Sequence, residues 1–312
     1  MRKIKPYFVL ICLMTLLFSC KESTFHEGKF FAGGVYATAD QLNDGKSVYM
    51  DYCVSCHGFN GDGNGVSGKG LFPPPRNFKL GIYKFGHVVA GELPHDDTLY
   101  KIIKHGLNGT AMLPWDMSKE QVYNVIQYIK TFAPKAWEGK DKKLGKKLVV
   151  GKDPYGASHK SFAIEKGKEV YHVVAQCQSC HRAYVSHEEL NKISLKINDE
   201  AIEDFDEEMY KLKLQEGEHG YKVMPPDFTM HELRSVGTMK EEKGLKDPER
   251  IAINDIYMRL LAGAGGAAMP SWKDVIEDNE IWALAYYVRY LQGFKKDQAK
   301  RKAFINSIEK NK

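Results

Sequence analysis

Two short motifs hold the side chains of this sequence that are best suited to chemistry. Each is a Cys-x-x-Cys pair followed directly by a histidine, and the residues are Cys53, Cys56, His57, Cys177, Cys180 and His181. This pattern is the attachment signature of c-type haem, in which two thiols add to the porphyrin vinyl groups and the histidine binds iron. A redox dithiol is expected within a βαβ pattern, which is missing here, and zinc needs four converging ligands per site. The motifs therefore predict two covalently attached haem c groups.

The two motifs belong to an internal repeat that covers most of the chain. Gly45 and Tyr49 precede the first motif, as Gly167 and Tyr171 precede the second. Further along each half, two glycines precede a methionine by six and three residues, and a tryptophan follows it by three. These residues are Gly106, Gly109, Met112 and Trp115 in the first half and Gly263, Gly266, Met269 and Trp272 in the second. The matching order predicts two tandem domains. We expect Gly45 and Gly167 to let the first helix of each domain approach the last one closely, with the two tyrosines packed near that crossing.

Helical patterning dominates both halves. Ser118 and Gln121 form a capping box ahead of apolar residues at helical spacing, and residues 281–288 repeat that spacing in the second half. Another helix is expected before each methionine, ending at Gly106 and at Gly263. Because no segment alternates convincingly at the strand period, we expect an all-α fold in which each domain is a small helical bundle around its haem.

Each half resembles a small monohaem cytochrome c domain of the class I type, through its haem motif, methionine register and final helix. The resemblance implies that a methionine thioether is the second axial ligand of each iron. Met112 would lie opposite His57, and Met269 opposite His181. Ligation by histidine and methionine raises the reduction potential. Side chains outside the repeat register are alternative ligands: Met117, Met224, Met230, Met239, His87, His105 and His172.

The resemblance also implies roles for residues around each haem. A proline carbonyl, from Pro75 in one half and Pro226 in the other, accepts a hydrogen bond from the proximal histidine and fixes its ring. Arg76 matches a position that pairs with a haem propionate, whereas Asp227 stands in that place in the second half. We therefore expect the two haems to differ in potential. Two tryptophans are also expected at the haems, Trp115 and Trp272.

The first twenty residues have the pattern of an export segment. A basic start precedes an apolar run at residues 7–18, which is too short for a comfortable membrane span. Residues 17–20 resemble a bacterial lipobox. This implies a lipoprotein signal peptide at residues 1–19 and a lipid-modified Cys20 that anchors the protein to a membrane. An ordinary secretory signal cut nearby, with Cys20 incidental, is the alternative. We therefore expect a periplasm-facing protein of the bacterial cell envelope.

The remaining boundaries follow from composition. We expect a flexible tether at residues 20–39, cytochrome c domains at 40–136 and 161–296, a linker at 137–160 and a charged C-terminal tail at 297–312. The lysine-rich linker indicates a solvated connector or a basic docking patch. Between its histidine and its methionine the second half is longer than the first, because of an acidic insertion near residues 186–222. That insertion is a solvated helical segment or a partner-docking surface.

Two filled axial positions leave no place for a substrate, so we expect an electron carrier rather than an enzyme. Its expected partners are the membrane and redox proteins such as a quinol-oxidising complex, a terminal oxidase or a periplasmic reductase. Loss of Arg2, Lys3 and Lys5 with the signal peptide lowers the formal net charge from +5 to +2, so no nucleic-acid partner is expected. The alternatives are a dihaem cytochrome c peroxidase-like enzyme and a fixed electron-transfer subunit of a larger respiratory complex.

Overall fold

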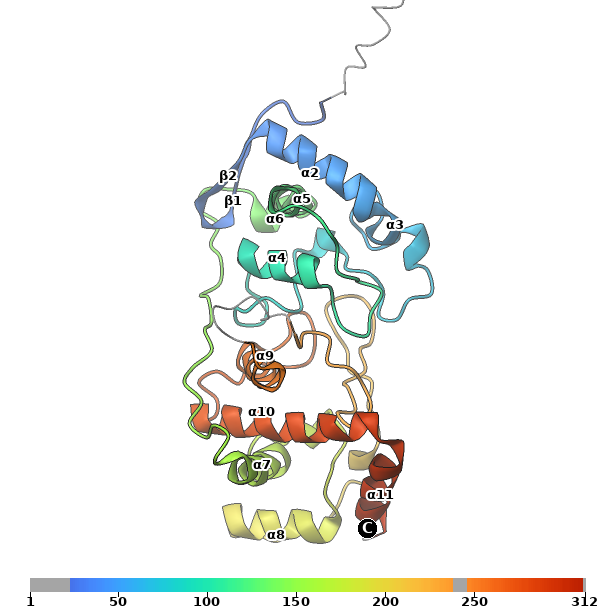
Figure 1. The fold of residues 1–312 in the computed structure, drawn as a ribbon, viewed down its shortest axis with the longest axis vertical. Helices are drawn as coiled ribbons and strands as arrows, with labels where there is room; N and C mark the ends of the chain where they lie inside the picture. The colour runs from blue at the N-terminus through green and yellow to red at the C-terminus, as the bar shows by residue number, and fades with distance from the viewer. Residues whose placement is uncertain (1–22, 238–245, 311–312) are drawn as a thin grey trace, which may run out of the picture.

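The computed structural model describes residues 23–237 and 246–310. The chain is built mainly from helices, arranged as two halves stacked along the long axis of the molecule (Figure 1). Each half has its own hydrophobic core, one drawn from residues 31–137 and the other from residues 148–308. This helix-rich architecture is consistent with a cytochrome c fold. Within the described residues, no helix combines the length and the apolar character that crossing a membrane requires.

The first half starts with a short antiparallel hairpin and continues with helices. Its elements are β1 (Lys29–Phe31), η1 (Ala32–Gly34), β2 (Val35–Ala37), α2 (Ala39–Tyr52), α3 (Val54–His57), η2 (Val66–Gly68), η3 (Phe78–Leu80), α4 (Asp96–His105), α5 (Lys119–Lys130) and α6 (Pro134–Trp137). Thr38 begins α2 and Ser118 begins α5, each in a capping box with a glutamine three residues later. The capping box expected at Ser118 is thus confirmed.

The second half repeats the central helices of the first and adds three elements of its own. Its elements are α7 (Lys160–Glu169), the π-helical turn η4 (Val170–Val174), η5 (Cys177–Ser179), α8 (His187–Asn198), η6 (Glu207–Tyr210), α9 (Pro248–Ala262), α10 (Asp278–Gln292), η7 (Gly293–Lys296) and α11 (Gln298–Glu309). The acidic insertion contains α8 and η6, and it buries Leu190, Ile193 and Met209 in the second core. The additions α8, η6 and α11 cover the end of the second half that lies away from the first (Figure 1).

The first and last helices of each half cross closely, as expected. Helix α2 packs on α5, and α7 packs on α10. At each crossing a glycine, Gly45 or Gly167, lies directly against a backbone carbonyl of the opposite helix. Tyr49 and Tyr171 pack beside these crossings, with Tyr49 edge-on to Tyr128 and Tyr171 edge-on to Tyr287. The repeat therefore places the two motifs in matching helical frames.

Two segments expected to be flexible or solvated are packed on the cores. The tether expected at residues 20–39 contains the β1–β2 hairpin, where Phe31 is fully buried. The linker expected at residues 137–160 contributes three buried side chains to the cores, Trp137, Leu148 and Tyr155. The segment expected as a charged C-terminal tail contains α11, where Ile308 is 5% exposed. In each segment widely spaced apolar residues are buried among charged ones, and strands of three residues are too short to show alternation.

Backbone hydrogen bonds join the two halves. The N–H of Gly265 donates to the carbonyl of Lys84 at 3.2 Å, and the N–H of Ala90 donates to the carbonyl of Ala262 at 2.8 Å. Gly265 also lies so close to the first half that a Cβ there would be 2.3 Å from the carbonyl oxygen of Tyr83. The loop that leads to Met269 is therefore packed against the first half.

Candidate haem sites

Each Cys-x-x-Cys-His motif forms one helical turn. The N–H of His57 donates to the carbonyl of Cys53 at 2.9 Å, and the N–H of His181 donates to the carbonyl of Cys177 at 2.8 Å. All four motif cysteines are free thiols of intermediate burial. Burial raises the pKa of Cys53 to about 12 and the pKa of Cys177 to about 12. Among residues 23–237 and 246–310, no three His, Cys, Asp or Glu side chains converge as metal ligands.

A backbone carbonyl orients each motif histidine. Nδ1 of His57 donates to the carbonyl of Arg76 at 3.0 Å, and Nδ1 of His181 donates to the carbonyl of Pro226 at 3.1 Å. Because a carbonyl only accepts, Nδ1 carries the hydrogen and Nε2 keeps its lone pair. The ring geometry thus fits iron binding through Nε2. The acceptor expected at Pro226 is in place, but the one expected at Pro75 is wrong, since the carbonyl of Arg76 takes that position.

Burial also favours the protonation state that binds metal. It lowers the pKa of both His57 and His181 below the ordinary imidazole value, and the hydrogen bond to the carbonyl opposes this effect. Neutral imidazole is the ligand form of histidine. Both rings are therefore prepared to bind iron at neutral pH.

A phenylalanine stacks on each histidine ring. Phe78 lies 4.5 Å from His57 between ring centroids, with planes 22° apart. Phe228 lies 4.7 Å from His181, with planes 23° apart. Sequence reasoning gave the two phenylalanines no role. Their stacking restricts rotation of the ligand ring in both halves.

The phenylalanines correct the register between the two halves. Each lies two residues after the accepting carbonyl, so Asn77 in the first half corresponds to Asp227 in the second. Both side chains accept the backbone N–H two residues later, at 3.0 Å for Asn77 and 2.8 Å for Asp227. The expected match of Arg76 with Asp227 is therefore wrong by one residue, and Arg76 corresponds to Pro226. Pro75 and Pro226 match in the sequence alignment, whereas Arg76 and Pro226 match in their contacts with the two histidines.

A tyrosine hydroxyl holds the residue after each histidine, which sequence reasoning missed. The hydroxyl of Tyr49 donates to the carbonyl of Gly58 at 2.7 Å, and that of Tyr171 donates to the carbonyl of Arg182 at 2.8 Å. The matching places of the two tyrosines ahead of their motifs were the available signal. They connect the helix crossing to the turn that carries the iron ligand.

The methionine loops are held by matching backbone bonds. The N–H of Leu107 donates to the carbonyl of Met112 at 2.8 Å, and the N–H of Ala264 donates to the carbonyl of Met269 at 3.1 Å. The preceding helices end, as expected, at glycines with φ of 68° and 73°, Gly106 and Gly263. Met112 packs on the core that holds Cys53, and Met269 packs on the core that holds Cys177. Each methionine thus packs against the same core as the first cysteine of the haem motif in its own half.

The alternative ligands have different surroundings. Met117 is 3% exposed inside the first core, whereas Met224 is 43% and Met230 47% exposed. Met239 lies outside the described residues. Both ring nitrogens of His172 hydrogen-bond to backbone groups, at 2.8 Å and 3.1 Å. These contacts favour Met112 and Met269 as the ligands.

The two tryptophans differ in their contacts. Trp115 is 36% exposed and lies edge-on to Tyr52, with ring centroids 5.5 Å apart. Trp272 packs against the second core, and its backbone N–H donates to the carbonyl of Leu260 at 3.1 Å. The two residues therefore occupy matching sequence positions in unlike environments.

Three cations, termed here the interface cations, gather where the halves meet: Arg76, Lys84 and Arg234. Nη1 of Arg76 lies 2.6 Å from Nδ1 of His219, a residue of the second half. Burial lowers the pKa of Lys84 to about 8, and the charges of Arg76 and Arg234 add to this effect. In the described part of the chain, none of the three forms an ion pair with a carboxylate. These side chains are partly buried, positive charge there is stabilised by an anionic partner, and haem propionates have the appropriate charge.

The expected lipidation site, Cys20, and the signal peptide expected at residues 1–19 lie outside the residues that the structure describes.

The fold and the histidine geometry thus define a helical protein with sites that fit haem. A family model described as "Cytochrome C oxidase, cbb3-type, subunit III" matches residues 40–129. A solved chain of the Kuenenia stuttgartiensis reducing HAO-like protein complex Kustc0457/Kustc0458 is 28% identical, with a TM-score of 0.60. The similarity covers 80% of this chain and 95% of that one. A search of curated proteins finds no match. These findings support a c-type cytochrome with covalently bound haem c and a role in electron transfer.

Proposed function

We propose that this protein is a membrane-anchored dihaem c-type cytochrome that passes single electrons between respiratory redox partners outside the cytoplasm. Residues 40–136 and 161–296 would each form one class I-type domain. His57 and Met112 bind one iron, and His181 and Met269 bind the other. Haem iron supplies reversible one-electron exchange between its ferrous and ferric states. A lipid on Cys20 keeps the protein near membrane-bound partners.

The repeated frame around the two motif histidines carries this proposal. In both halves a carbonyl orients Nδ1, a phenylalanine stacks on the ring and a tyrosine hydroxyl holds the next residue. Both halves also close the methionine loop with a matching backbone bond, and both methionines pack against the core of their own half. A peroxidase-like enzyme needs one iron with an open position. The matching loops favour two filled sites and an electron carrier.

The interface cations support electron passage between the halves. Arg76, Lys84 and Arg234 would compensate the negative charge of haem propionates in this buried region. The bond from Gly265 to Lys84 links the loop before Met269 to the first half. Both sites therefore border one packed interface, and an electron that enters one half can leave through the other.

A second role is favoured by one comparison. The solved Kuenenia stuttgartiensis chain belongs to a protein complex. This chain could likewise be a fixed electron-transfer subunit rather than a free shuttle. Purification from detergent-solubilised membranes separates the two roles, because a fixed subunit elutes with its partners and a shuttle elutes alone.

The central test is an optical redox titration of the purified full-length protein. We expect two one-electron transitions and a low-spin spectrum from both haems. A high-spin haem in the oxidised protein, or turnover of hydrogen peroxide, would favour the peroxidase. A colourless polypeptide after expression with full haem-attachment machinery would overturn the proposal. Mass spectrometry of the N-terminal peptide tests acylation of Cys20, and Cys20→Ser should release the protein from membranes.

A further inference from the structure

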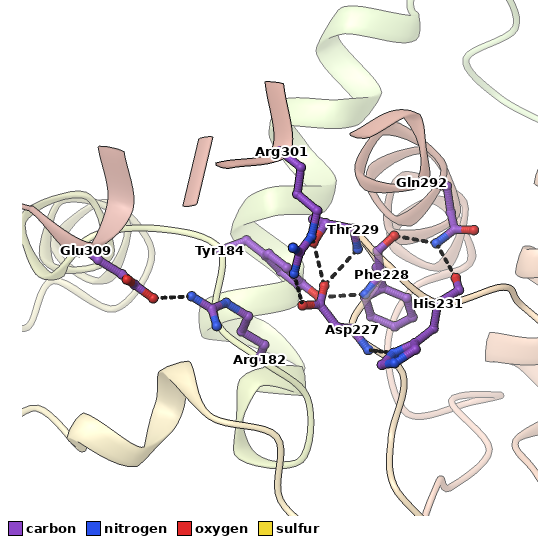
Figure 2. Close-up of polar contacts among 9 residues, drawn as sticks. All are labelled: Arg182, Tyr184, Asp227, Phe228, Thr229, His231, Gln292, Arg301 and Glu309. Carbon is purple, nitrogen blue, oxygen red and sulfur yellow. Dashed lines mark hydrogen bonds and ion pairs between the residues drawn. The ribbon is translucent and has the colours of Figure 1, made fainter. Parts of the chain in front are cut away.

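Two side chains of the C-terminal helix α11 contact two separate segments of the second half, as Figure 2 shows: Arg301 contacts Asp227 and Glu309 contacts Arg182. Near its start, Nη2 of Arg301 lies 3.2 Å from Oδ2 of Asp227. At its end, Glu309 lies 2.5 Å from Nη2 of Arg182. Arg182 directly follows His181, and Asp227 directly follows the residue whose carbonyl accepts from the His181 ring. The last helix therefore supports the two segments that position this ligand.

Asp227 is the buried centre of these contacts, and we call Asp227, Tyr184, Thr229 and Arg301 the Asp227 network. Oδ1 of Asp227 accepts from the hydroxyl of Tyr184 at 3.1 Å and from the N–H and hydroxyl of Thr229 at 2.8 Å and 2.6 Å. Burial raises the pKa of this carboxyl, but the hydrogen bonds and the charge of Arg301 outweigh it, so the pKa lies below its ordinary value. Asp227 is thus ionised at neutral pH.

The negative end of the network is less exposed to water than its positive end. The side chain of Asp227 is 5% exposed, whereas that of Arg301 is 29% exposed. Water screens an exposed charge more strongly than a buried one. The carboxylate also lies nearer in sequence to the carbonyl that holds the ligand ring. Asp227 therefore contributes negative charge near the second iron site, whereas the less exposed end of the Arg182–Glu309 pair is positive.

The network is linked to the ring that stacks on His181. The hydroxyl of Tyr184 accepts the N–H of Phe228 at 2.7 Å while it donates to Asp227. The side-chain amide of Gln292, at the end of α10, donates to the carbonyl of Phe228 and to that of His231. The residue of the stacked ring and the buried charge are consequently parts of one hydrogen-bonded unit (Figure 2), and the accepting carbonyl of Pro226 is joined to it by the peptide bond to Asp227.

The first half has no such charge in the matching place. Asn77 is the counterpart of Asp227, and its neutral amide oxygen accepts only the N–H of Lys79, at 3.0 Å. In the first half it is the ring of Phe132 that packs on this segment. It stacks on Phe78, with ring centroids 6.3 Å apart and planes 13° apart. The halves also differ in that Arg182 follows His181 where Gly58 follows His57, and in that Arg76 corresponds to Pro226. The charge of Asp227 is thus one defined difference among these.

A buried negative charge stabilises the ferric form of a haem over the ferrous form, because oxidation adds one positive charge. We propose that the Asp227 network holds the reduction potential of the second site below that of the first, so that electrons pass from the second half to the first. This inference rests on the proposed dihaem function. In the step, one electron leaves the second site, which is oxidised, and reduces the first, and no bond forms or breaks. Asp227 is a positioning residue that acts through the field and through the loop that holds His181.

The test is a potentiometric titration of full-length holoprotein carrying Asp227→Asn, which gives the second half the residue of the first. We expect the lower midpoint alone to rise, by about tenfold in the equilibrium constant for reduction, or about 59 mV for one electron. Met269→Ala should change the spin state and the midpoint of the second haem only, so an unchanged higher midpoint in this variant assigns the lower one to the second half. Asp227→Glu keeps the charge and should retain the midpoint close to its original value. Asp204→Asn removes one exposed carboxylate of the insertion and should shift neither midpoint.

The converse variant keeps the proposal testable if Asp227→Asn does not fold. Asn77→Asp adds the charge to the first half and should lower the higher midpoint alone. The proposal is overturned if Asp227→Asn shifts both midpoints equally or neither, or if Met269→Ala assigns the higher midpoint to the second half. Two low-spin haems in those experiments would leave the proposed function intact. A protein without two haems would contradict the proposed function itself.

Discussion

Gly45 lies against the backbone of Asn124 so closely that a Cβ on Gly45 would be 2.1 Å from the carbonyl oxygen. Gly167 has the same relation to Ala283, also at 2.1 Å. Real Cβ atoms do not approach a carbonyl oxygen to this distance, so the helices would have to separate. This close approach sets the spacing of each helix pair and, through Tyr49 and Tyr171, the place of the motif turn.

Replacing Gly45 or Gly167 by alanine should therefore destabilise the half that contains it. Overpacking of this kind typically costs about 1 to 3 kcal/mol. Urea unfolding followed by haem absorbance and by circular dichroism measures the loss. Gly293→Ala is the matched control, because Gly293 has helical dihedral angles and open space around its Cα. Equal stability of Gly45→Ala and Gly293→Ala would contradict the packing argument.

Replacing Met112 or Met269 by alanine should weaken the sulfur-to-iron absorption band of the oxidised protein by about half each, because each haem would lose its thioether ligand. Met117→Ala is the informative comparison. Met117 is buried in the first core, so its truncation should cost stability, about 2 to 5 kcal/mol, and leave the band unchanged. A band at full strength in Met112→Ala and at about half strength in Met117→Ala would reverse the assignment in the first half.

Much of the site could be predicted because its residues repeat in order. The Cys-x-x-Cys-His motifs, the glycine helix ends and the close helix crossings each have a local signal that two copies reinforce. The carbonyl that holds His57 had no such signal. Adjacent prolines occur in both halves, three in the first and two in the second, and sequence matching aligned Pro75 with Pro226. The hydrogen bond depends instead on how the loop approaches the imidazole. Only the ring stack of Phe78 and Phe228 identifies Asn77 as the counterpart of Asp227.

The segments outside the repeat were harder to predict. The β1–β2 hairpin has strands of three residues, which is too short for an alternating pattern. Helix α11 carries many charges and few apolar residues, yet Arg301 and Glu309 bind groups that lie far away in sequence. A charged segment that is fully solvated can have the same composition as a charged segment whose side chains pair with buried groups. Long-range contacts of this kind do not follow from a single sequence.

His172 should make stability depend on pH. Burial lowers the pKa of His172 to about 3, and its ring hydrogen-bonds to backbone groups on both sides. The unfolded state therefore takes up a proton near pH 6.5 that the folded state excludes until about pH 3. Above pH 6.5 the contribution of His172 to the free energy of unfolding should be fully present. Below it, this residue should reduce stability by up to about 1.4 kcal/mol per pH unit.

His172→Gln removes this linkage. The slope of the unfolding free energy against pH should therefore fall by the contribution of one proton. Urea unfolding between pH 7 and pH 5 measures the slope in the variant and in the wild type. Some slope should remain, because burial also lowers the pKa of His87 to about 3 and that of His219 to about 4. An unchanged slope in the variant would show that His172 is not kept neutral in the folded protein.

Lys130 should be a stability determinant of the first half. Its side chain is fully buried, its Nζ lies 2.6 Å from Oδ1 of Asp96, and it lies 5.0 Å from the ring centroid of Trp137. Lys130→Met leaves the carboxylate of Asp96 without its cation, which should cost about 3 to 5 kcal/mol. The double variant Lys130→Met with Asp96→Asn should recover part of the loss. Lys192→Met breaks an exposed pair on α8 and should have no measurable effect.

Arg76 should influence the potential of the first haem in the sense opposite to Asp227. Its carbonyl holds the ring of His57, and its guanidinium lies among the interface cations. A buried positive charge disfavours the ferric form, so Arg76→Gln should lower the higher midpoint and move the lower midpoint less. Lys79→Gln, which removes an exposed cation from the same segment, is the matched control and should leave both midpoints in place.

Because Arg76→Gln and Asp227→Asn each narrow the gap between the midpoints, electron transfer from the second half to the first should lose driving force in both. A redox titration of the double variant gives the decisive comparison. If the two residues act on separate sites, their effects on the gap add, and an effect no larger than that of either single variant would show that they act on the same site.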